Sequence, residues 1–422
     1  MRTLSIVFVS LCSVLGAAIA ADEPPAPTSL DALVGSVVAG HPELAFYEAE
    51  LAAARAEGRA ARAWSDPELS VSFGRKSVSE GGLSREGAAW SVALAQTFEW
   101  PGRIALRKAV ADRDLALAEL ALENFRAELG GRVRALACGL LAARDQARAA
   151  SEVAARFTEL KETFLAREPG GLTPQLEIRV IEAQELVLQR RATQAQLEID
   201  AALIALNLLR GAPPQTPLEL TGRGLTLVEA PAVEALIATA LEHNLAFRAR
   251  VLELERQGLR VDLARHEGRP AVTLAPFFEE ENAVGRERTI GLGVSVPLPV
   301  GGRAPAVVAG AQARRAQAEA SLAAAQLELE REIVTALHAY RLHRDDRQRW
   351  PIATIQSFRE AAAVADRHYR LGAVPIGTYV ELQASYLEAV ESVLEIEQAA
   401  LEAGLRLESL TSGAWRAVEV MP

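Results

Sequence analysis

The stretch WSVALAQTFEWPGR, residues 90–103, decides the fold, because it contains a strand, a turn and the start of a helix. Apolar side chains alternate with small or polar ones from Trp90 to Trp100, which indicates a β-strand with one apolar face. Pro101 and Gly102 then allow a sharp change of direction. From Arg103 to Arg167 the sequence has no proline. We therefore predict a strand that turns directly into a very long helix.

The same arrangement returns about 200 residues later, a period far longer than that of solenoid repeats. Residues 290–303, IGLGVSVPLPVGGR, alternate again and end in the turn Gly301-Gly302 before another helical stretch. Two further matches follow the same order: HPELAF (41–46) corresponds to HNLAF (243–247), and GLTP (171–174) corresponds to GAVP (372–375). Three ordered matches indicate an internal duplication.

The duplication predicts two structural repeats, residues 21–210 and 232–422, joined by a proline-containing linker over 211–231. Each repeat should hold a helix, a β-hairpin and a long helical hairpin. In the first repeat we expect the helix over 29–64, with Ser29 as its N-cap, the β-hairpin over 68–100 with a polar loop over 77–87, and the helical hairpin over 103–210. In the second repeat we expect the helix over 232–268, the β-hairpin over 270–299 with a loop over 279–287, and the helical hairpin over 304–412, interrupted at Pro351.

Apolar residues seven positions apart mark both helical hairpins, which implies left-handed supercoiling against neighbouring helices. These are Leu115, Leu122, Leu129 and Leu136 in the first, and Val380, Leu387, Leu394 and Leu401 in the second.

Residues 1–20 have the composition of a secretory signal. Arg2 is basic, Leu4 to Leu15 is apolar, and Ala18-Ile19-Ala20 offers small residues for cleavage after Ala20. We expect an exported mature chain; an uncleaved anchor is the alternative. Lipidation at Cys12 is left open, because bulky Leu11 precedes it. Beyond Ala21 the sequence has no run of 18 apolar residues, so we expect no further membrane-spanning helix.

Composition excludes several classes of function. The chain has 45 Lys+Arg against 55 Asp+Glu and a net charge of −10, which disfavours a nucleic-acid-binding protein. Two cysteines form neither a disulfide framework nor a zinc site made of cysteine pairs. The motifs of nucleophilic hydrolases, phosphate-binding loops and zinc proteases are absent from the sequence. We predict no enzyme activity, no cofactor and no metal site.

The strands point to an oligomeric conduit. Four amphipathic strands are too few to close a barrel, because about eight strands form the smallest barrel, with an interior that side chains just fill. Open sheet edges cannot face lipid. Several copies would therefore complete one barrel, with the long helices continuing it as a cylinder. A soluble four-stranded domain is the alternative, because amphipathic strands also cover ordinary cores.

The duplicated order of elements resembles the TolC-like outer-membrane efflux channels over nearly all of the mature chain. QTFEWPGR, residues 96–103, is similar to the strand-to-helix turn of the heavy-metal (cobalt-zinc-cadmium type) branch, and Tyr369-Arg370-Leu371-Gly372 with Ala384 resembles the second hairpin tip. The resemblance implies a mainly α fold with a membrane β part, in which a homotrimer forms a composite β-barrel continued by an α-helical tunnel. It also implies an outer-membrane location with a large periplasmic part.

The resemblance implies a function as well. It predicts the exit duct of a tripartite efflux system, passive itself, with a periplasmic adaptor and an inner-membrane pump as partners and heavy-metal cations as cargo. Three alternatives stay open: an exported structural coiled-coil protein, a periplasmic adaptor, and a TolC-like duct for drugs or for type I polypeptide secretion.

Candidate functional residues lie at the ends of the helical hairpins. The tips Gly171-Leu172-Thr173-Pro174 and Gly372-Ala373-Val374-Pro375 are the short turns of the long helical region, and we expect the adaptor to contact them. Nearby charges are candidate gate or pore-mouth groups: Glu177, Asp366, Arg367 and Glu381. For each of these charges, a solvated helix face is the alternative.

Overall fold

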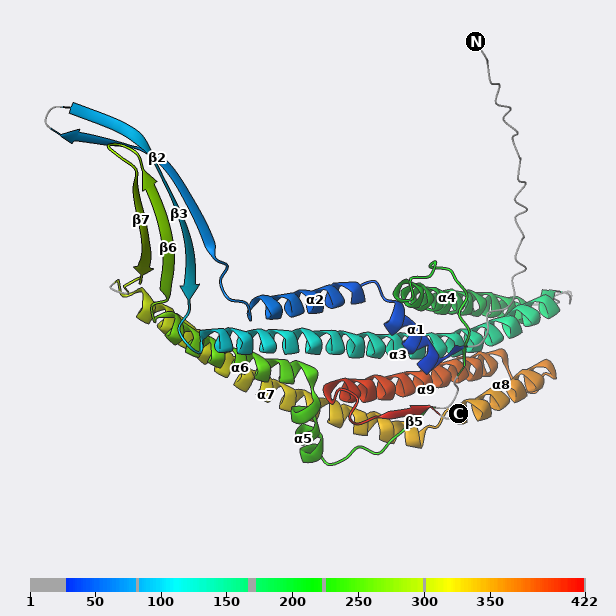
Figure 1. Cartoon of the computed structure of the whole chain (residues 1–422). Coiled ribbons are helices and arrows are strands. Elements are labelled where there is room, and N and C mark those ends of the chain that lie inside the picture. The colour runs from blue at the N-terminus through cyan, green and yellow to red at the C-terminus, as the bar shows by residue number, and fades with distance from the viewer. Residues whose placement is uncertain (1–27, 81–82, 166–171, 222–224, 299–300, 421–422) are drawn as a thin grey trace, which may run out of the picture.

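The computed structural model describes residues 28–80, 83–165, 172–221, 225–298 and 301–420. These residues form an elongated molecule with a β-sheet at one end and long helices running away from it to the other (Figure 1).

Two helices precede each pair of long strands. They are α1 (Leu30–Gly40) and α2 (Leu44–Ala60) in the first half, and α5 (Val233–His243) and α6 (Leu245–Glu267) in the second. The prediction of one continuous helix in each half is therefore wrong. His41 is extended because Pro42 disfavours a helical residue before it, and the Asn244 side chain starts α6 by accepting from the Phe247 N–H at 2.8 Å. Ser29 caps α1 as expected, accepting from the Ala32 N–H at 3.3 Å.

Five further helices build the body of the molecule. In the first half these are α3 (Arg103–Leu165) and α4 (Leu172–Leu209); in the second they are α7 (Arg303–Arg349), α8 (Thr354–Arg370) and α9 (Ile376–Leu410). At 1.5 Å per residue, α3 is about 95 Å long. The break between α7 and α8 falls at Pro351, where the sequence places it. Within the described residues, no helix combines the length and the apolar character needed to cross a bilayer.

A four-stranded antiparallel sheet joins the two halves. Its order is β2 (Glu68–Glu80), β3 (Leu83–Phe98), β6 (Val272–Glu281) and β7 (Glu287–Ser295), so β3 of the first half pairs with β6 of the second. The strands extend into both predicted polar loops. Residues 77–80 pair with 83–86, because a polar sequence forms ladder hydrogen bonds when both faces are exposed. The expected loops over 77–87 and 279–287 are therefore too long.

Two small sheets pair the first and last strands of the described chain with strands between the two halves. β1 (Thr28–Ser29) runs parallel to β4 (Leu220–Thr221), and β5 (Leu225–Leu227) pairs antiparallel with β8 (Val418–Val420). The expected linker over 211–231 thus contains two strands. The buried Tyr340 hydroxyl of α7 lies 2.6 Å from the Val228 carbonyl oxygen and donates to it, which anchors this linker to the helices.

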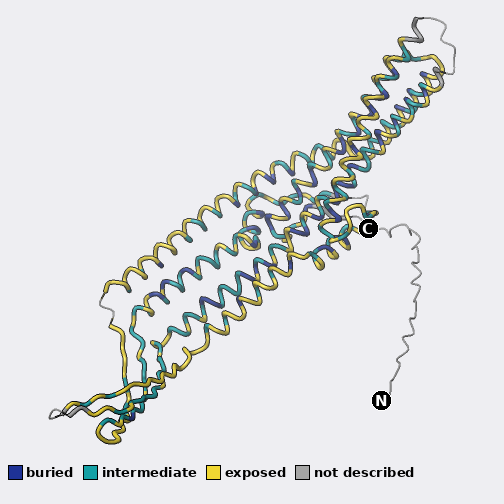
Figure 2. Tube along the Cα trace, turned by 90° about the horizontal axis from the view of Figure 1, so that it is seen from above, coloured by how far each residue is buried: buried dark blue, intermediate teal, exposed yellow. Residues whose placement is uncertain are grey.

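Buried side chains form separate clusters along the helices instead of one central core. One cluster joins α1, α3 and α4 around Leu140, a second joins α5, α7 and α9 around Ile333, and a third joins α3, α4, α8 and α9 around Phe157. The sheet and the helix ends beside it are mostly exposed (Figure 2). The sheet therefore lacks the cover that a single chain normally supplies.

Candidate functional site

One side of the sheet, which we call the apolar face, is a continuous hydrophobic surface. Strand register places its side chains opposite one another across the strands, for example Phe73 opposite Trp90 and Phe278 opposite Ile290. The apolar face consists of Leu69, Val71, Phe73, Trp90, Val92, Leu94, Val272, Leu274, Phe278, Ile290, Leu292 and Val294. Phe73 is 83% exposed and Ile290 is 82% exposed. An apolar patch of this kind on a monomer marks contact with a protein or a membrane.

The opposite side of the sheet carries mainly polar and small side chains. Ser72 and Ser91 share a hydrogen bond of 2.7 Å, and Thr97 and Thr273 share one of 3.0 Å. Gly291 leaves room for the Phe277 ring, which lies against it. At the end far from the helices this side becomes acidic: Glu279, Glu281 and Glu287 outnumber the cations Lys76 and Arg85, and Lys76 pairs with Glu281 and Glu287. Such a surface suits contact with water.

The edges of the sheet are open. Within the described chain, β2 and β7 each pair with a neighbour on one side only. Unpaired edge groups are a template for pairing with another strand, and native proteins do not leave them bare in hydrocarbon.

Glycines make the turns from strand to helix. Gly102 has φ 90° and Gly302 has φ 69°, values that disfavour other residues; Pro101 and Gly301 precede them in the same turns. Arg103, just after the first turn, donates from Nη2 to the carbonyl oxygens of His266, Glu267 and Arg269 at 3.0–3.1 Å. This arginine ties the first half to the end of α6, a role that spacing along the sequence does not reveal.

The second hairpin tip is a tight turn between α8 and α9. Gly372 has φ 71°, and the Ala373 N–H donates to the His368 carbonyl oxygen at 2.9 Å, so the last carbonyls of α8 are satisfied. Val374 and Pro375 complete the turn, and Pro375 directly precedes α9.

The first hairpin tip differs from the expectation. Gly171 lies outside the described residues, and Leu172, Thr173 and Pro174 belong to the first turn of α4 instead of a loop. Pro174 is tolerated there because the first N–H groups of a helix have no partner within the helix.

A polar network beside the second tip connects the two helical hairpins. Arg370 of α8 binds Glu159 of α3 in bidentate fashion, at 2.9 and 3.2 Å, and Asp366 at 2.9 Å. The Tyr379 hydroxyl donates to Asp366 at 3.2 Å. The hydrogen bond from Arg370 lowers the pKa of Glu159, and burial raises the pKa of Tyr379. Glu159, Arg370 and Tyr379 were missed as candidates; the only local signal is that Asp366 and Arg370 are four apart on a helix.

The other predicted gate charges are not part of this network. Burial, and then the charge of Glu177, raises the pKa of Tyr369 to about 12, so Glu177 lies near the ring that stacks on Tyr379. Arg367 and Glu381 are on the exposed surface. Of the four predicted charges, the structure brings only Asp366 into direct contact with a neighbouring helix.

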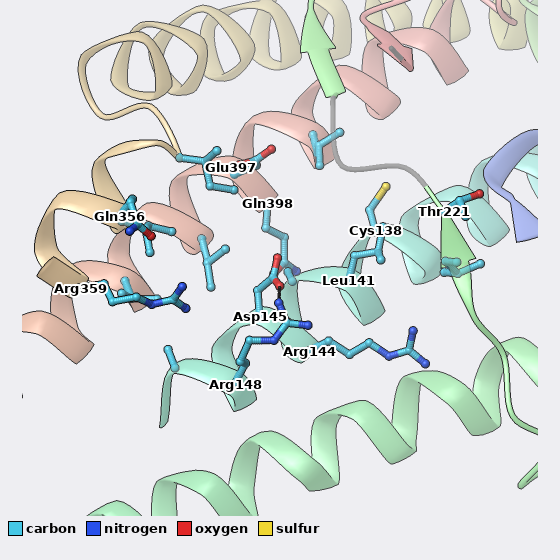
Figure 3. Close-up of a pocket in the computed structure, with 18 of the residues that line it drawn as sticks. Cys138, Leu141, Arg144, Asp145, Arg148, Thr221, Gln356, Arg359, Glu397 and Gln398 are labelled. Atoms are coloured by element: carbon cyan, nitrogen blue, oxygen red, sulfur yellow. Dashed lines mark hydrogen bonds and ion pairs between the residues drawn. The ribbon is translucent and has the colours of Figure 1, made fainter. Parts of the chain in front are cut away.

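A cavity of about 550 Å³ lies between α3, the start of α8, α9 and β4 (Figure 3). Arg144, which donates to the Leu218 carbonyl oxygen at 2.7 Å, and the pair Arg148–Asp145 line it from α3. Burial raises the pKa of the Cys138 thiol in its wall to about 11, which keeps this cysteine unreactive. Segments far apart in sequence form the cavity, so no motif could predict it.

Comparison with known families decides between the channel and its alternatives. Residues 33–212 and 236–413 match the outer membrane efflux protein family. The chain belongs to this family. The predicted TolC-like efflux channel is thereby confirmed at the level of the family, and the structural coiled-coil protein and the adaptor are set aside.

Solved structures share the fold of this outer membrane efflux protein. A membrane protein from Pseudomonas aeruginosa is 20% identical, with 92% of this chain and 90% of that chain covered and a TM-score of 0.76. The Campylobacter jejuni CmeC outer membrane channel is 16% identical, with 99% and 95% covered and a TM-score of 0.72. The open state of the Neisseria gonorrhoeae MtrE outer membrane channel is 14% identical, with 92% and 90% covered and a TM-score of 0.73. No curated protein sequence matches the chain.

Proposed function

We propose that the chain is one protomer of a homotrimeric exit duct of a tripartite efflux system. In this duct the apolar face contacts the bilayer of the outer membrane, and the helices continue the barrel as a tunnel through the periplasm. An adaptor and an inner-membrane pump supply the substrate, and the duct itself is passive.

The observation that carries the proposal is the four-stranded sheet with an exposed apolar face and two open edges. Copies that pair β2 of one chain with β7 of the next remove the edges and close a barrel, the only sheet that spans a membrane. The number three follows from the resemblance to TolC-like channels.

The helices offer a matching contact for neighbouring copies. An exposed apolar stripe runs along one side of α4, at spacings of four, seven and ten residues that keep side chains on one helix face. It consists of Leu176, Val180, Val187, Leu197, Ile204 and Leu208. A second chain packed on this stripe would extend the tunnel wall around the axis.

For the cargo we propose heavy-metal cations. The resemblance of residues 96–103 to the heavy-metal branch supports this choice, and so does the acidic end of the polar side, where Glu279, Glu281 and Glu287 outnumber Lys76 and Arg85. Drugs or a secreted polypeptide are the alternative cargo. Measuring metal tolerance of cells with and without the gene, beside tolerance to uncharged drugs, separates these classes.

The oligomeric state tests the proposal directly. We expect detergent-extracted protein to have about three times the mass of the mature chain after the micelle is subtracted, because a single chain leaves the sheet edges unpaired. Light scattering with refractive index detection measures this mass. A stable monomer in detergent, with its sheet intact by circular dichroism, would contradict the duct.

We further propose that the hairpin tips, Gly171–Pro174 and Gly372–Pro375, dock the adaptor, and that Glu177, Asp366, Arg367 and Glu381 surround the pore mouth. The α8–α9 turn stands at the far end of the molecule from the sheet (Figure 1), with no bulky group over Gly372. Small residues there permit close packing of a partner's helices.

Cysteine crosslinking tests this docking. In a Cys138→Ser background, Leu172→Cys and Val374→Cys should crosslink to the cognate adaptor, because both residues lie at the tips. Arg344→Cys, on α7 and away from both tips, is the matched control and should not crosslink. Crosslinks at position 344 with none at the tips would show that the adaptor docks along the side of the helices.

A further inference from the structure

Two arginines share one buried carboxylate at the end of the sheet far from the helices. Glu280 is 8% exposed although it lies on an open sheet, because guanidinium groups cover it. Arg286 Nε lies 3.1 Å from its Oε1, and Arg288 Nε lies 2.9 Å from its Oε2. The side chains of Arg286 and Arg288 are themselves 62% and 55% exposed.

This cluster belongs to the apolar face. Glu280 is opposite Trp90 on β3 and opposite Arg288 on β7, and it follows Phe278 at the two-residue spacing that keeps a side chain on one face. The rings of Trp90 and Phe278 are in contact at 5.2 Å between centroids. Tryptophan is enriched where a membrane surface meets water. The arginines therefore begin where the hydrophobic surface ends.

At the end of the sheet that holds Glu280, the two sides of the sheet carry net charges of opposite sign. The apolar side carries Arg75, Arg286 and Arg288 against Glu86 and Glu280, a net charge of 3 − 2 = +1. The polar side carries Lys76 and Arg85 against Glu279, Glu281 and Glu287, a net charge of 2 − 3 = −1. The net positive charge thus lies on the side that the hydrophobic residues share.

The shared carboxylate orients the arginines toward an anion. Both contact Glu280 through Nε, so their terminal Nη groups are not used in these two bonds. A guanidinium has five N–H donors in a planar fork that matches the oxygens of a phosphate. Two forks fixed side by side at the edge of a hydrophobic surface fit a ligand with a phosphate attached to apolar chains.

We propose that Arg286 and Arg288, held by Glu280, bind the phosphate of a lipid headgroup at the rim of the apolar face. The proposal rests on the proposed function, since it requires that this face contacts the bilayer. Bound lipid would fix the depth of the sheet in the membrane at the level of β7.

Native mass spectrometry of the detergent-purified oligomer tests the proposal. The probes are phosphatidic acid and phosphatidylcholine with identical acyl chains, titrated separately. We expect the wild type to retain phosphatidic acid more tightly than phosphatidylcholine. Removing each arginine should weaken phosphatidic acid about 5-fold, and about 25-fold in Arg286→Ala/Arg288→Ala. Phosphatidylcholine should weaken less, because its choline cation offsets the charge of its phosphate. The matched control Arg314→Ala/Arg315→Ala removes two exposed arginines from α7 and should retain both lipids as the wild type does.

The outcomes separate this inference from the function on which it rests. Equal retention of both lipids by wild type and by Arg286→Ala/Arg288→Ala overturns only the phosphate site. Retention of neither lipid by the wild type overturns the membrane-facing sheet as well. Displacement of phosphatidic acid by inorganic phosphate at similar concentration assigns the site to free phosphate and overturns the lipid. If the double variant does not assemble, the single variant Arg286→Ala, in the turn before β7, carries the test.

Discussion

Val294→Arg should nearly abolish assembly of the oligomer in the outer membrane. Val294 is 61% exposed at the centre of the apolar residues of β7 and its continuation, between Leu292 and Val296. Arginine on the lipid face near the bilayer midplane costs about 2–4 kcal/mol in each chain, and every chain of the oligomer carries the change. The yield of assembled oligomer in isolated outer membranes, measured by quantitative immunoblotting without heating, gives the effect.

Ser295→Arg is the matched control for this experiment. Ser295 is the neighbouring residue on the same strand and lies on the opposite side of the sheet, where it pairs with Thr273. An arginine there would face water, so the yield should stay near that of the wild type. Equal losses from both variants would mean that strand disruption, and not lipid contact, causes the effect. Loss from Ser295→Arg alone would mean that the two faces are assigned the wrong way round.

Tyr379→Ala should unfold the second hairpin tip while the sheet stays assembled. Tyr379 is fully buried, stacks on Tyr369 at 4.8 Å between ring centroids, and contacts the Phe157 ring at 5.4 Å. Truncating a large buried aromatic residue costs about 3–5 kcal/mol. Because the tip is one end of a long hairpin with its own cluster of buried residues, this loss should remain local. Faster hydrogen exchange over 354–390, with unchanged exchange in the strands, measures it.

Tyr379→Phe separates packing from hydrogen bonding at the same position. It keeps the ring and removes only the bond to Asp366, which we expect to cost about 0.5–1.5 kcal/mol. Exchange at the tip should therefore rise slightly. A Tyr379→Ala protein whose tip exchanges as slowly as the wild type would show that Tyr379 does not hold the α8–α9 turn together.

The elements with strong periodicity could be predicted from the sequence. Alternation around Trp90 marks β3, and the absence of proline after Arg103 marks α3. Local chemistry was harder to interpret. Residues 77–80 are mostly polar, which is typical of a loop, but a strand exposed on both sides needs no apolar residues to form its ladder. Pro42 does break the first helix, but the periodicity of the residues around it concealed the break.

Contacts between distant segments could not be predicted at all. Glu159 and Arg370 are 211 residues apart, and neither stands out among the many charges of the helices. Their pairing depends on how α3 and α8 pack, which is decided by the buried cluster around Phe157. Glu280 is close in sequence to Arg286 and Arg288, but its pairing with them depends on the register of the β6–β7 hairpin. Tip glycines and strand patterns are local signals, whereas networks of this kind are properties of the folded chain.

The unequal lengths of the two β-hairpins have a consequence for the outer surface of a cell. β3 pairs with β6 from Ala89 to Phe98, and the Asn282 N–H donates to the Ala88 carbonyl oxygen, so residues 83–87 extend beyond the four-stranded part (Figure 1). At about 3.3 Å per residue this overhang is roughly 16 Å long. In the proposed duct it would stand clear of the lipid, once per chain. Phages, antibodies and labels that reach the cell from outside would meet this ribbon first, and a peptide tag placed there would report which way the protein faces.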